Sequence, residues 1–97
     1  ITVHFHNTFG LGIANTIEAI KSGAEVIETA IGGLGGCPFT KVAAGNVSTE
    51  DFVNYLQRKK ERMDISLNNL LNLSKKISIY FNKELQSYTF KVGKFKL

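Results

Sequence analysis

Hydrophobic and polar positions alternate first with the period of a strand and then with that of a helix. Residues 1–6, "ITVHFH", place apolar and polar side chains in strict alternation, which predicts a strand. The turn-rich segment that follows offers Asn15 or Thr16 as the cap of a helix that ends at Gly23. β-Branched residues and a terminal glycine cluster predict a second strand over residues 24–33. Because strand, helix and strand in this order form a βαβ unit, we expect a parallel strand pair with a right-handed crossover.

A capping box predicts the start of the next helix at Ser48. The Ser48 hydroxyl can accept a hydrogen bond from a first-turn amide, and Asp51 lies three residues later. Glu50 and Asp51 are expected to favour the positive end of the helix dipole, and the basic run at residues 57–62, "QRKKER", suits its negative end. The apolar stripe between these ends would face the core.

A third helix is predicted over roughly residues 66–81, where apolar residues recur at helical spacing. We expect this stripe to belong to the core; its members are Leu67, Leu70, Leu71, Leu73, Ile77 and Tyr80. The tail from residue 86 onward shows no decided pattern. Two parallel strands cannot bury both faces of their own sheet, so the whole pattern indicates part of a larger α/β fold.

Length and composition limit the chain to one domain or less. Its 97 residues include 43% hydrophobic and 21% charged residues, which is typical of a chain that buries a core. No apolar run approaches the roughly 18 residues that span a bilayer, so we expect no membrane segment. The chain begins at Ile1, within a strand pattern and without a Met, which indicates further residues upstream.

Charge and cysteine usage restrict the function further. The net charge of +4 comes mainly from residues 57–62 and 91–97, and it lacks the interleaved aromatics of a nucleic-acid surface. We therefore expect no nucleic-acid partner. The single cysteine, Cys37, excludes an internal disulfide and favours a reducing compartment such as the cytoplasm.

His4 and His6 are the first candidates for chemistry. At positions i and i+2 of a strand, their imidazoles project from the same face and can reach one metal ion. A pair of strand histidines hydrogen-bonded in a polar patch has the same pattern. Because a turn follows His6, the pair lies at the carboxyl end of its strand, where α/β folds bind ligands.

The glycine-rich segment "GGLGGCP" is the second candidate. Its glycines can adopt positive φ and form a close approach to a ligand or a lid, although a long turn has the same composition. It matches neither of the common phosphate-binding glycine patterns. Cys37 lies outside any amphipathic stripe, and its thiol has either a reactive role or a structural or incidental one. Asn46, just past the loop, could serve in a turn, as a helix cap or as an oxygen ligand.

Residues 3–23 and 32–56 together resemble the 3-hydroxy-3-methylglutaryl-CoA lyases, which are metal-dependent TIM-barrel lyases. The H-x-H pattern is shared with condensing enzymes such as the isopropylmalate and homocitrate synthases, but the "GLGGCP" loop is typical of the lyases. The resemblance implies an α/β fold that is the C-terminal fragment of a (β/α)8 TIM barrel. Residues 1–60 would supply strand 7, helix 7, strand 8 and helix 8, and residues 61–97 a C-terminal helical extension and tail.

The resemblance also implies roles for individual residues. His4, His6 and Asn46 match ligands of a Mg²⁺ or Mn²⁺ ion, and Cys37 matches the catalytic cysteine of a mobile loop over the substrate. The other residues of this substrate loop are Gly33, Leu34, Gly35, Gly36 and Pro38.

The implied reaction is the cleavage of 3-hydroxy-3-methylglutaryl-CoA into acetyl-CoA and acetoacetate, in leucine degradation or ketone-body formation. A divalent ion would polarise the substrate's oxygens, and a thiol, whose reference pKa is about 8.5, could protonate the departing enolate. The complete enzyme would form a homodimer and act in the cytoplasm, or in the mitochondrial matrix of a eukaryote.

Other parts of the family's site have no counterpart in this sequence. An Arg–Asp pair from the first strand, an acidic partner from the next strand and a later Asp are missing, while Asn7 and Phe9 stand where the lyases commonly have Asp and Tyr. We therefore expect the isolated chain to be inactive and the complete barrel to be the enzyme. Two alternatives stay open: a catalytically inactive truncated remnant or interaction fragment, and a related acyl-CoA condensing synthase.

Overall fold

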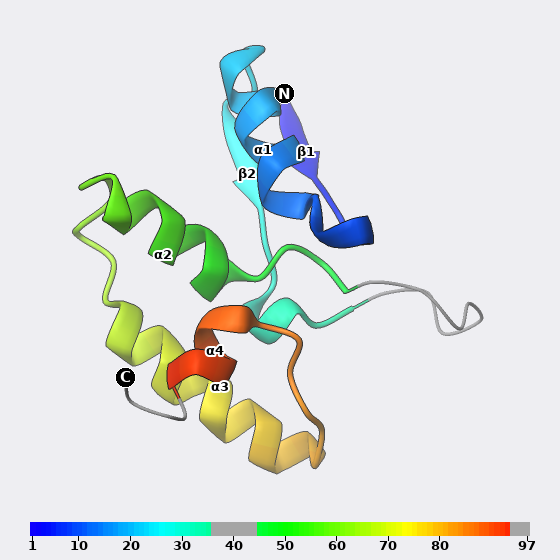
Figure 1. Cartoon of the computed structure of the whole chain (residues 1–97), viewed down its shortest axis with the longest axis vertical. Helices are drawn as coiled ribbons and strands as arrows, with labels where there is room; N and C mark the ends of the chain where they lie inside the picture. The colour runs from blue at the N-terminus through cyan, green and yellow to red at the C-terminus, as the bar shows by residue number, and fades with distance from the viewer. Residues whose placement is uncertain (36–44, 94–97) are drawn as a thin grey trace.

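The computed structural model describes residues 1–35 and 45–93. A strand pair with one helix forms one part of the molecule, and three helices gather in the other part (Figure 1). In chain order the elements are β1 (Thr2–His4), α1 (Gly12–Lys21), β2 (Val26–Glu28), α2 (Thr49–Arg58), α3 (Leu67–Phe81) and α4 (Tyr88–Gly93). Two short 3₁₀ turns, Thr8–Gly10 and Ile31–Gly33, follow the strands.

The predicted βαβ unit is present with shorter strands than expected. β1 and β2 pair in parallel, with Thr2 opposite Val26 and His4 opposite Glu28. Each strand has three residues rather than the six or more that the pattern predicted. Helix α1 connects them and lies against β1 (Figure 1). The parallel pairing is confirmed, and its carboxyl end leads to His6 and to the glycine-rich turn.

Helix α1 begins earlier than the sequence predicted. Asn15 and Thr16 do not cap it, because the helix starts at Gly12. The Asn7 Oδ1 accepts a hydrogen bond from the Gly12 amide at 3.0 Å, and the Thr16 hydroxyl donates within the helix to the Gly12 carbonyl. The prediction was wrong because the acceptor comes from a residue before the turn, outside the usual capping position. The predicted end at Gly23, with φ of +106°, agrees with the last helical residue, Lys21.

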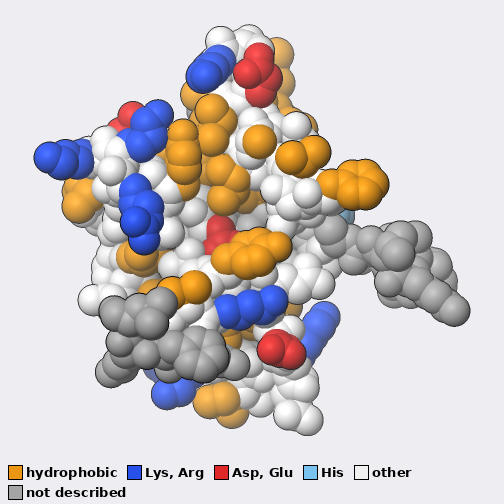
Figure 2. Space-filling view, in the orientation of Figure 1, with side chains coloured by type: hydrophobic (Ala, Val, Ile, Leu, Met, Phe, Trp, Pro, Cys, Tyr) orange, Lys and Arg blue, Asp and Glu red, His pale blue; other side chains and the backbone are white. Residues whose placement is uncertain are grey.

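The core lies among the helices and not under the strands. Its fully apolar members are Val47, Phe52, Val53, Leu85 and Phe90, which come from the segment before α2, from α2 itself and from the region of α4. The strand pair has only half-buried or exposed side chains, and apolar side chains reach the surface around it and α1 (Figure 2). Exposed side chains on both strands are expected, because a sheet of two strands needs more elements packed on it to bury its faces.

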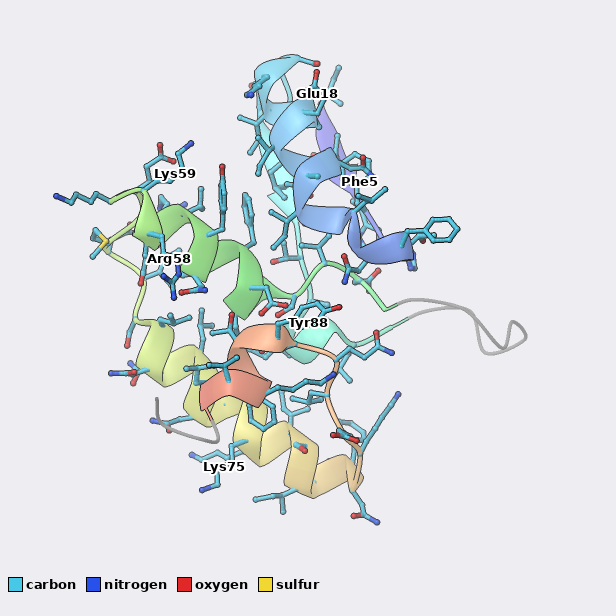
Figure 3. All side chains as sticks on the ribbon, viewed as in Figure 1. Phe5, Glu18, Arg58, Lys59, Lys75 and Tyr88 are labelled. Atoms are coloured by element: carbon cyan, nitrogen blue, oxygen red, sulfur yellow. The ribbon has the colours of Figure 1, made fainter. Side chains whose placement is uncertain are left out.

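Helix α2 begins where its Ser48 cap predicted, and α3 (Leu67–Phe81) lies close to the range that its apolar spacing predicted. Ser48 accepts a hydrogen bond from the Asp51 amide at 3.2 Å, which confirms the Ser48 cap, and Ser66 caps α3 in the same way. Arg58 and Lys59 project from the carboxyl end of α2, as the helix dipole favours (Figure 3). Among the described helices, none combines the length and the apolar character that a crossing of a membrane requires.

The apolar stripe of α3 is not core, contrary to expectation. Ser74 is the only buried residue of this helix, and Leu73 and Tyr80 are exposed. Helix α3 packs against α2, α4 and the 3₁₀ turn Ile31–Gly33, and the other members of its stripe are half-buried: Leu67, Leu70, Leu71 and Ile77. Helical spacing therefore identified a helix correctly but did not reveal how much of its apolar face is covered.

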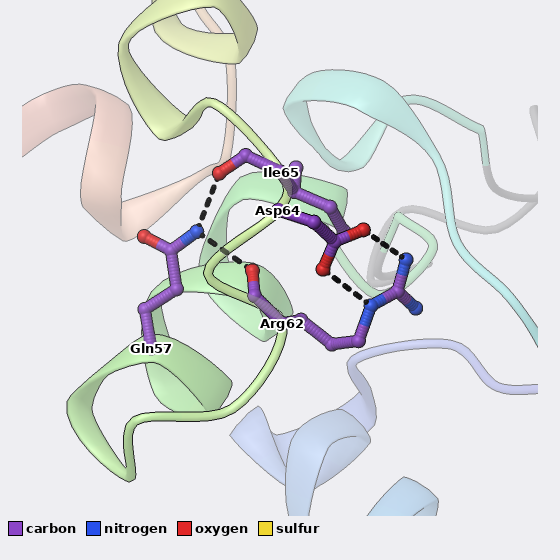
Figure 4. A network of polar contacts seen from close by, with 4 residues as sticks. All are labelled: Gln57, Arg62, Asp64 and Ile65. Atoms are coloured by element: carbon purple, nitrogen blue, oxygen red, sulfur yellow. Dashed lines mark hydrogen bonds and ion pairs between the residues drawn. The ribbon is translucent and has the colours of Figure 1, made fainter.

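A network of polar contacts closes the turn between α2 and α3 (Figure 4). The Gln57 Nε2 donates to the carbonyls of Arg62 and Ile65 at 3.1 and 2.6 Å. Arg62 forms two hydrogen bonds of 3.0 Å to the Asp64 carboxylate, which lower the pKa of Asp64 and raise that of Arg62. Both side chains are exposed, so solvent screens this pair and we expect it to add little to stability.

The undecided tail forms α4, and Asp51 holds it in place. The Asp51 carboxylate accepts hydrogen bonds from the Ser87 hydroxyl at 3.1 Å and from the amides of Tyr88 and Thr89 at 3.1 and 2.7 Å. We expected Asp51 to act only at the start of its own helix, α2. Its carboxylate also caps α4, which is distant in the sequence. The amides of Tyr88 and Thr89 belong to the first turn of α4, where backbone amides have no partner within the helix and need another acceptor.

We predict that Asp51→Ala loosens α4. Three donors lose their acceptor, which should lower the free energy of unfolding by about 1–2 kcal/mol. Urea unfolding and hydrogen exchange of the α4 amides measure the two effects. Asp64→Ala is the matched control, because it removes an exposed carboxylate, and its urea midpoint should stay near that of the wild type. Equal midpoints for Asp51→Ala and the wild type would contradict the prediction.

Candidate functional site

His4 and His6 lie side by side at the carboxyl end of β1. Their ring centroids are 5.4 Å apart, with 72° between the ring planes. His4 is the last residue of the strand, and His6 follows two residues later where the backbone is still paired. The structure therefore brings the two imidazoles together, as the i, i+2 spacing predicted.

Asn46 joins the histidines from the far side of the glycine loop. Asn46 and His6 form an isolated antiparallel bridge, which is held by hydrogen bonds from the Val47 amide to the Phe5 carbonyl and from the Asn7 amide to the Gly45 carbonyl. The flanking positions of this bridge carry the hydrogen bonds, and in such a pair the opposed side chains lie on one face and close together. Two segments 40 residues apart thus supply three polar side chains to one place.

The side-chain amide of Asn46 is fixed in one orientation. Its Nδ2 donates to the Leu34 carbonyl at 2.8 Å, whereas its Oδ1 is buried and accepts no hydrogen bond from any described residue. A buried carbonyl oxygen without a partner is rare in a folded protein, because its desolvation is not compensated. The default interpretation of Asn46 as a turn or cap residue does not explain this oxygen, and Ser48 already caps α2.

These donors suit a divalent cation, although they form an incomplete set. A hard ion such as Mg²⁺ or Mn²⁺ prefers oxygen and accepts imidazole, so two histidines and an amide oxygen are compatible ligands. The carboxylate of Glu28 lies close to one of them, with its Oε2 3.7 Å from the His4 Nδ1. Residues 1–35 and 45–93 contain no cluster of three or more His, Cys, Asp or Glu side chains that could hold a metal. Further ligands would have to come from elsewhere.

The glycine-rich turn closes the base of the predicted loop. Gly32, Gly33 and Gly35 have φ of +65°, +73° and +110°, which confirms the expectation of positive φ. A Cβ on Gly35 would collide with the Asn46 amide, and one on Gly45 with the Gly33 carbonyl. Glycine thus permits the two ends of the loop to touch.

The structure does not describe three of the predicted site residues. Cys37, Gly36 and Pro38 lie outside the described residues. Gly33, Leu34 and Gly35 are described, and they contact or adjoin Asn46 at the base of the loop.

A small cavity of about 140 Å³ lies beside Asn46. Its lining includes Asn7 and the C-terminal residues Gln86 and Tyr88, the last at the start of α4 (Figure 3). The Gln86 Oε1 also accepts a hydrogen bond from the Gly45 amide at 3.0 Å. No sequence pattern indicated that the tail returns to the loop, because the pattern of the tail is undecided and the contact spans 41 positions.

Glu50 has a role that the helix dipole does not explain. Its side chain is fully buried, with Oε1 2.7 Å from the Gly32 amide and Oε2 2.8 Å from the Ser74 hydroxyl. The carboxylate therefore joins the glycine-rich turn to α3. No local sequence signal distinguishes it from an ordinary acidic residue in the first turn of a helix.

Comparison with known proteins agrees with this arrangement. The model of the HMGL-like family matches residues 1–77. Hydroxymethylglutaryl-CoA lyase YngG of Bacillus subtilis is 37% identical over 94 residues, which are 97% of this chain and 31% of that protein. The human mitochondrial hydroxymethylglutaryl-CoA lyase is 36% identical over 87 residues, 90% of this chain and 27% of that protein. The chain thus spans about three tenths of the length of these curated relatives.

Solved structures are similar over nearly the whole chain. The crystal structure of the Bacillus subtilis HMG-CoA lyase has a TM-score of 0.87 at 37% identity, covering 97% of this chain and 32% of that one. An HMG-CoA lyase from Acinetobacter baumannii, in complex with coenzyme A and 3-methylmalate, has a TM-score of 0.83 at 41% identity, covering 95% of this chain and 30% of that one. The α/β fold therefore matches part of these lyase structures. Because the family model covers most of its residues, the chain belongs to the HMGL-like family.

Proposed function

We propose that this chain is the metal-binding and thiol-bearing portion of a hydroxymethylglutaryl-CoA lyase. Joined to the remainder of a barrel, it would cleave 3-hydroxy-3-methylglutaryl-CoA to acetyl-CoA and acetoacetate, in leucine degradation or ketone-body formation. The observation that carries the proposal is the buried Asn46 Oδ1, which has no partner among the described residues and belongs to a residue paired with His6, beside His4. The family membership and the relatives' names support the same activity.

The proposed architecture divides the chain in two. Residues 1–60 would be the last two β/α units of a TIM barrel, with β1, α1, β2 and α2 as its strand 7, helix 7, strand 8 and helix 8. Residues 61–97 would be the C-terminal extension. The division is supported by the uncovered strand pair, whose neighbours in a barrel would be further strands.

His4, His6 and Asn46 would hold a Mg²⁺ or Mn²⁺ ion together with ligands from the remainder of the barrel. Such an ion, when bound, would polarise the hydroxyl and carbonyl oxygens of the substrate as a Lewis acid. The Leu34 carbonyl would keep the Asn46 amide turned so that its oxygen and not its nitrogen faces the ion. The substrate class, a coenzyme A thioester, is supported by the coenzyme A found with the Acinetobacter baumannii lyase.

Cys37 would supply a proton to carbon. Loss of the substrate's C3 hydroxyl proton and cleavage of the C2–C3 bond leave acetoacetate and the enolate of acetyl-CoA, which must then be protonated. A neutral thiol can give that proton, and the loop of Gly33, Leu34, Gly35, Gly36 and Pro38 would present it while excluding water. Positive φ at Gly33 and Gly35, at the base of this loop, supports such a turn.

We predict that the 97-residue chain is inactive alone and active with the missing part. Residues of the Bacillus subtilis lyase that precede its matching portion, coexpressed with this chain, should restore acetoacetate formation that depends on Mg²⁺ or Mn²⁺. A coupled assay for acetoacetate measures the product, with an EDTA-treated sample as the control. Condensation of acetyl-CoA with a 2-oxo acid would instead indicate a synthase, and no activity in a folded complex would indicate an inactive remnant.

We predict that Cys37→Ser lowers the turnover of that complex by about 100-fold or more, because a hydroxyl is a far weaker proton donor. Metal content, measured by elemental analysis, should stay unchanged, since Cys37 is not a proposed ligand. Ser22→Cys in the Cys37→Ser background controls for a thiol that is not on the loop, because Ser22 is exposed. Turnover equal to that of the unmodified complex would exclude the proton-donor role.

We predict that Asn46→Ala weakens binding of Mn²⁺ about tenfold or more, which corresponds to about 1.4 kcal/mol for the loss of one oxygen ligand. The EPR signal of free Mn²⁺ during a titration of the chain gives the dissociation constant. Asn72→Ala, at an exposed position of α3, is the control and should bind as the wild type does. Unchanged affinity in Asn46→Ala would remove Asn46 from the ligand set.

A further inference from the structure

We propose that Glu50 is a positioning residue, which orients the Asn46 side chain by holding the glycine-rich turn over residues 31–34. The inference rests on the proposed metal site, because it concerns the direction in which the Asn46 oxygen faces. Glu50 itself would contact neither metal nor substrate.

The surroundings of Glu50 are unusual for a carboxylate. The side chain is fully buried, and its hydrogen-bond donors are neutral: the Gly32 amide and the Ser74 hydroxyl. The ion pairs found between described residues, His4–Glu28 and Arg62–Asp64, do not include it. Burying a carboxylate without a cation is costly, so stability alone is a poor explanation for an acid at this position.

Glu50 acts on a glycine turn within a segment that is tied at both ends. Backbone hydrogen bonds from Gly33 to Ala30 and from Leu34 to Ile31 close this turn. Before the turn, Ala30 is bonded to the Val47 carbonyl and to the Thr49 amide. After the turn, the Leu34 carbonyl accepts from Asn46. Between these ties Gly32 and Gly33 both have positive φ, a region in which glycine has wide backbone freedom. Among the described residues, Glu50 is the one whose side chain is hydrogen-bonded to the backbone of residues 31–33.

The position of this turn determines whether the Oδ1 or the Nδ2 of the Asn46 side chain faces the histidines. A carbonyl accepts from Nδ2 and cannot accept from Oδ1, so a correctly placed Leu34 carbonyl fixes the amide. If the turn moved, the amide could rotate and present Nδ2, a donor that cannot ligate a cation. A Cβ at Gly35 would collide with the Asn46 Nδ2, so glycine is needed where the backbone passes this group.

The conservative variant Glu50→Gln separates hydrogen bonding from charge. Its amide oxygen can still accept from Gly32, and its nitrogen can donate to Ser74. The Ser74 hydroxyl lies 2.9 Å from the Leu70 carbonyl and can turn its hydrogen there. Every partner stays satisfied in Glu50→Gln, whereas Glu50→Ala leaves the Gly32 amide buried and unpaired.

Side-chain amide NMR of the chain without metal tests the positioning directly. In Glu50→Ala the Asn46 Nδ2 protons should exchange with water about tenfold faster and change chemical shift, because the Leu34 carbonyl no longer holds them. Glu50→Gln should stay within about twofold of the wild type. Val53→Ala removes a buried apolar contact from the same helix; it should lower the thermal midpoint but leave the Asn46 signals in place.

Titration with Mn²⁺ followed by EPR then tests whether the orientation of the Asn46 side chain affects the affinity for the metal. Glu50→Ala should raise the dissociation constant about tenfold, and Glu50→Gln should restore it. Unchanged Asn46 signals in Glu50→Ala, or equal changes in Val53→Ala, would overturn the positioning role. A wild-type chain that binds no Mn²⁺ would contradict the proposed metal site, and the amide signals would still decide the positioning on their own.

Discussion

The bridge between His6 and Asn46 is the contact on which the candidate site depends. It joins the carboxyl end of β1 to the segment that returns from the glycine loop, and the backbone hydrogen bonds on both sides of it set the facing of both side chains. Without this bridge the two histidines would lie on a short exposed strand, and Asn46 would have no reason to approach them. The predicted ligands therefore form one group because of backbone pairing and not because of mutual attraction.

The first turn of α2, which follows Asn46 closely in the sequence, holds the segments around that bridge. Ser48 caps the helix, Glu50 holds the glycine-rich turn, and Asp51 holds the start of α4. Each of these three side chains satisfies backbone amides that would otherwise be orphaned. The helix start thus connects the loop base, α3 and α4, which explains why polar side chains are buried in a core with few apolar members.

Local signals could be predicted from the sequence, and distant partners could not. The parallel strand pair, the Ser48 cap and the span of α3 follow from periodicity and capping within a few residues. The true cap of α1, the roles of Glu50 and Asp51 and the exposed face of α3 depend on what lies nearby in space. His4 and His6 were candidates from their spacing along a strand, and a family resemblance assigned Asn46 to the same site. Their approach to one another is a property of the fold alone.

The three candidate ligands differ in how firmly the chain holds them. Asn46 is fixed by the Leu34 carbonyl and lies next to the core, whereas His4 comes from a strand pair that, among the described helices, α1 alone packs against, and 43% of its side chain is exposed. A metal site gains affinity when its ligands are oriented before binding, because less freedom is lost. In this chain the oxygen ligand is preorganised and the imidazoles are less so. Strands packed beside β1 and β2 would therefore improve binding by ordering the histidines, even before they contribute ligands of their own.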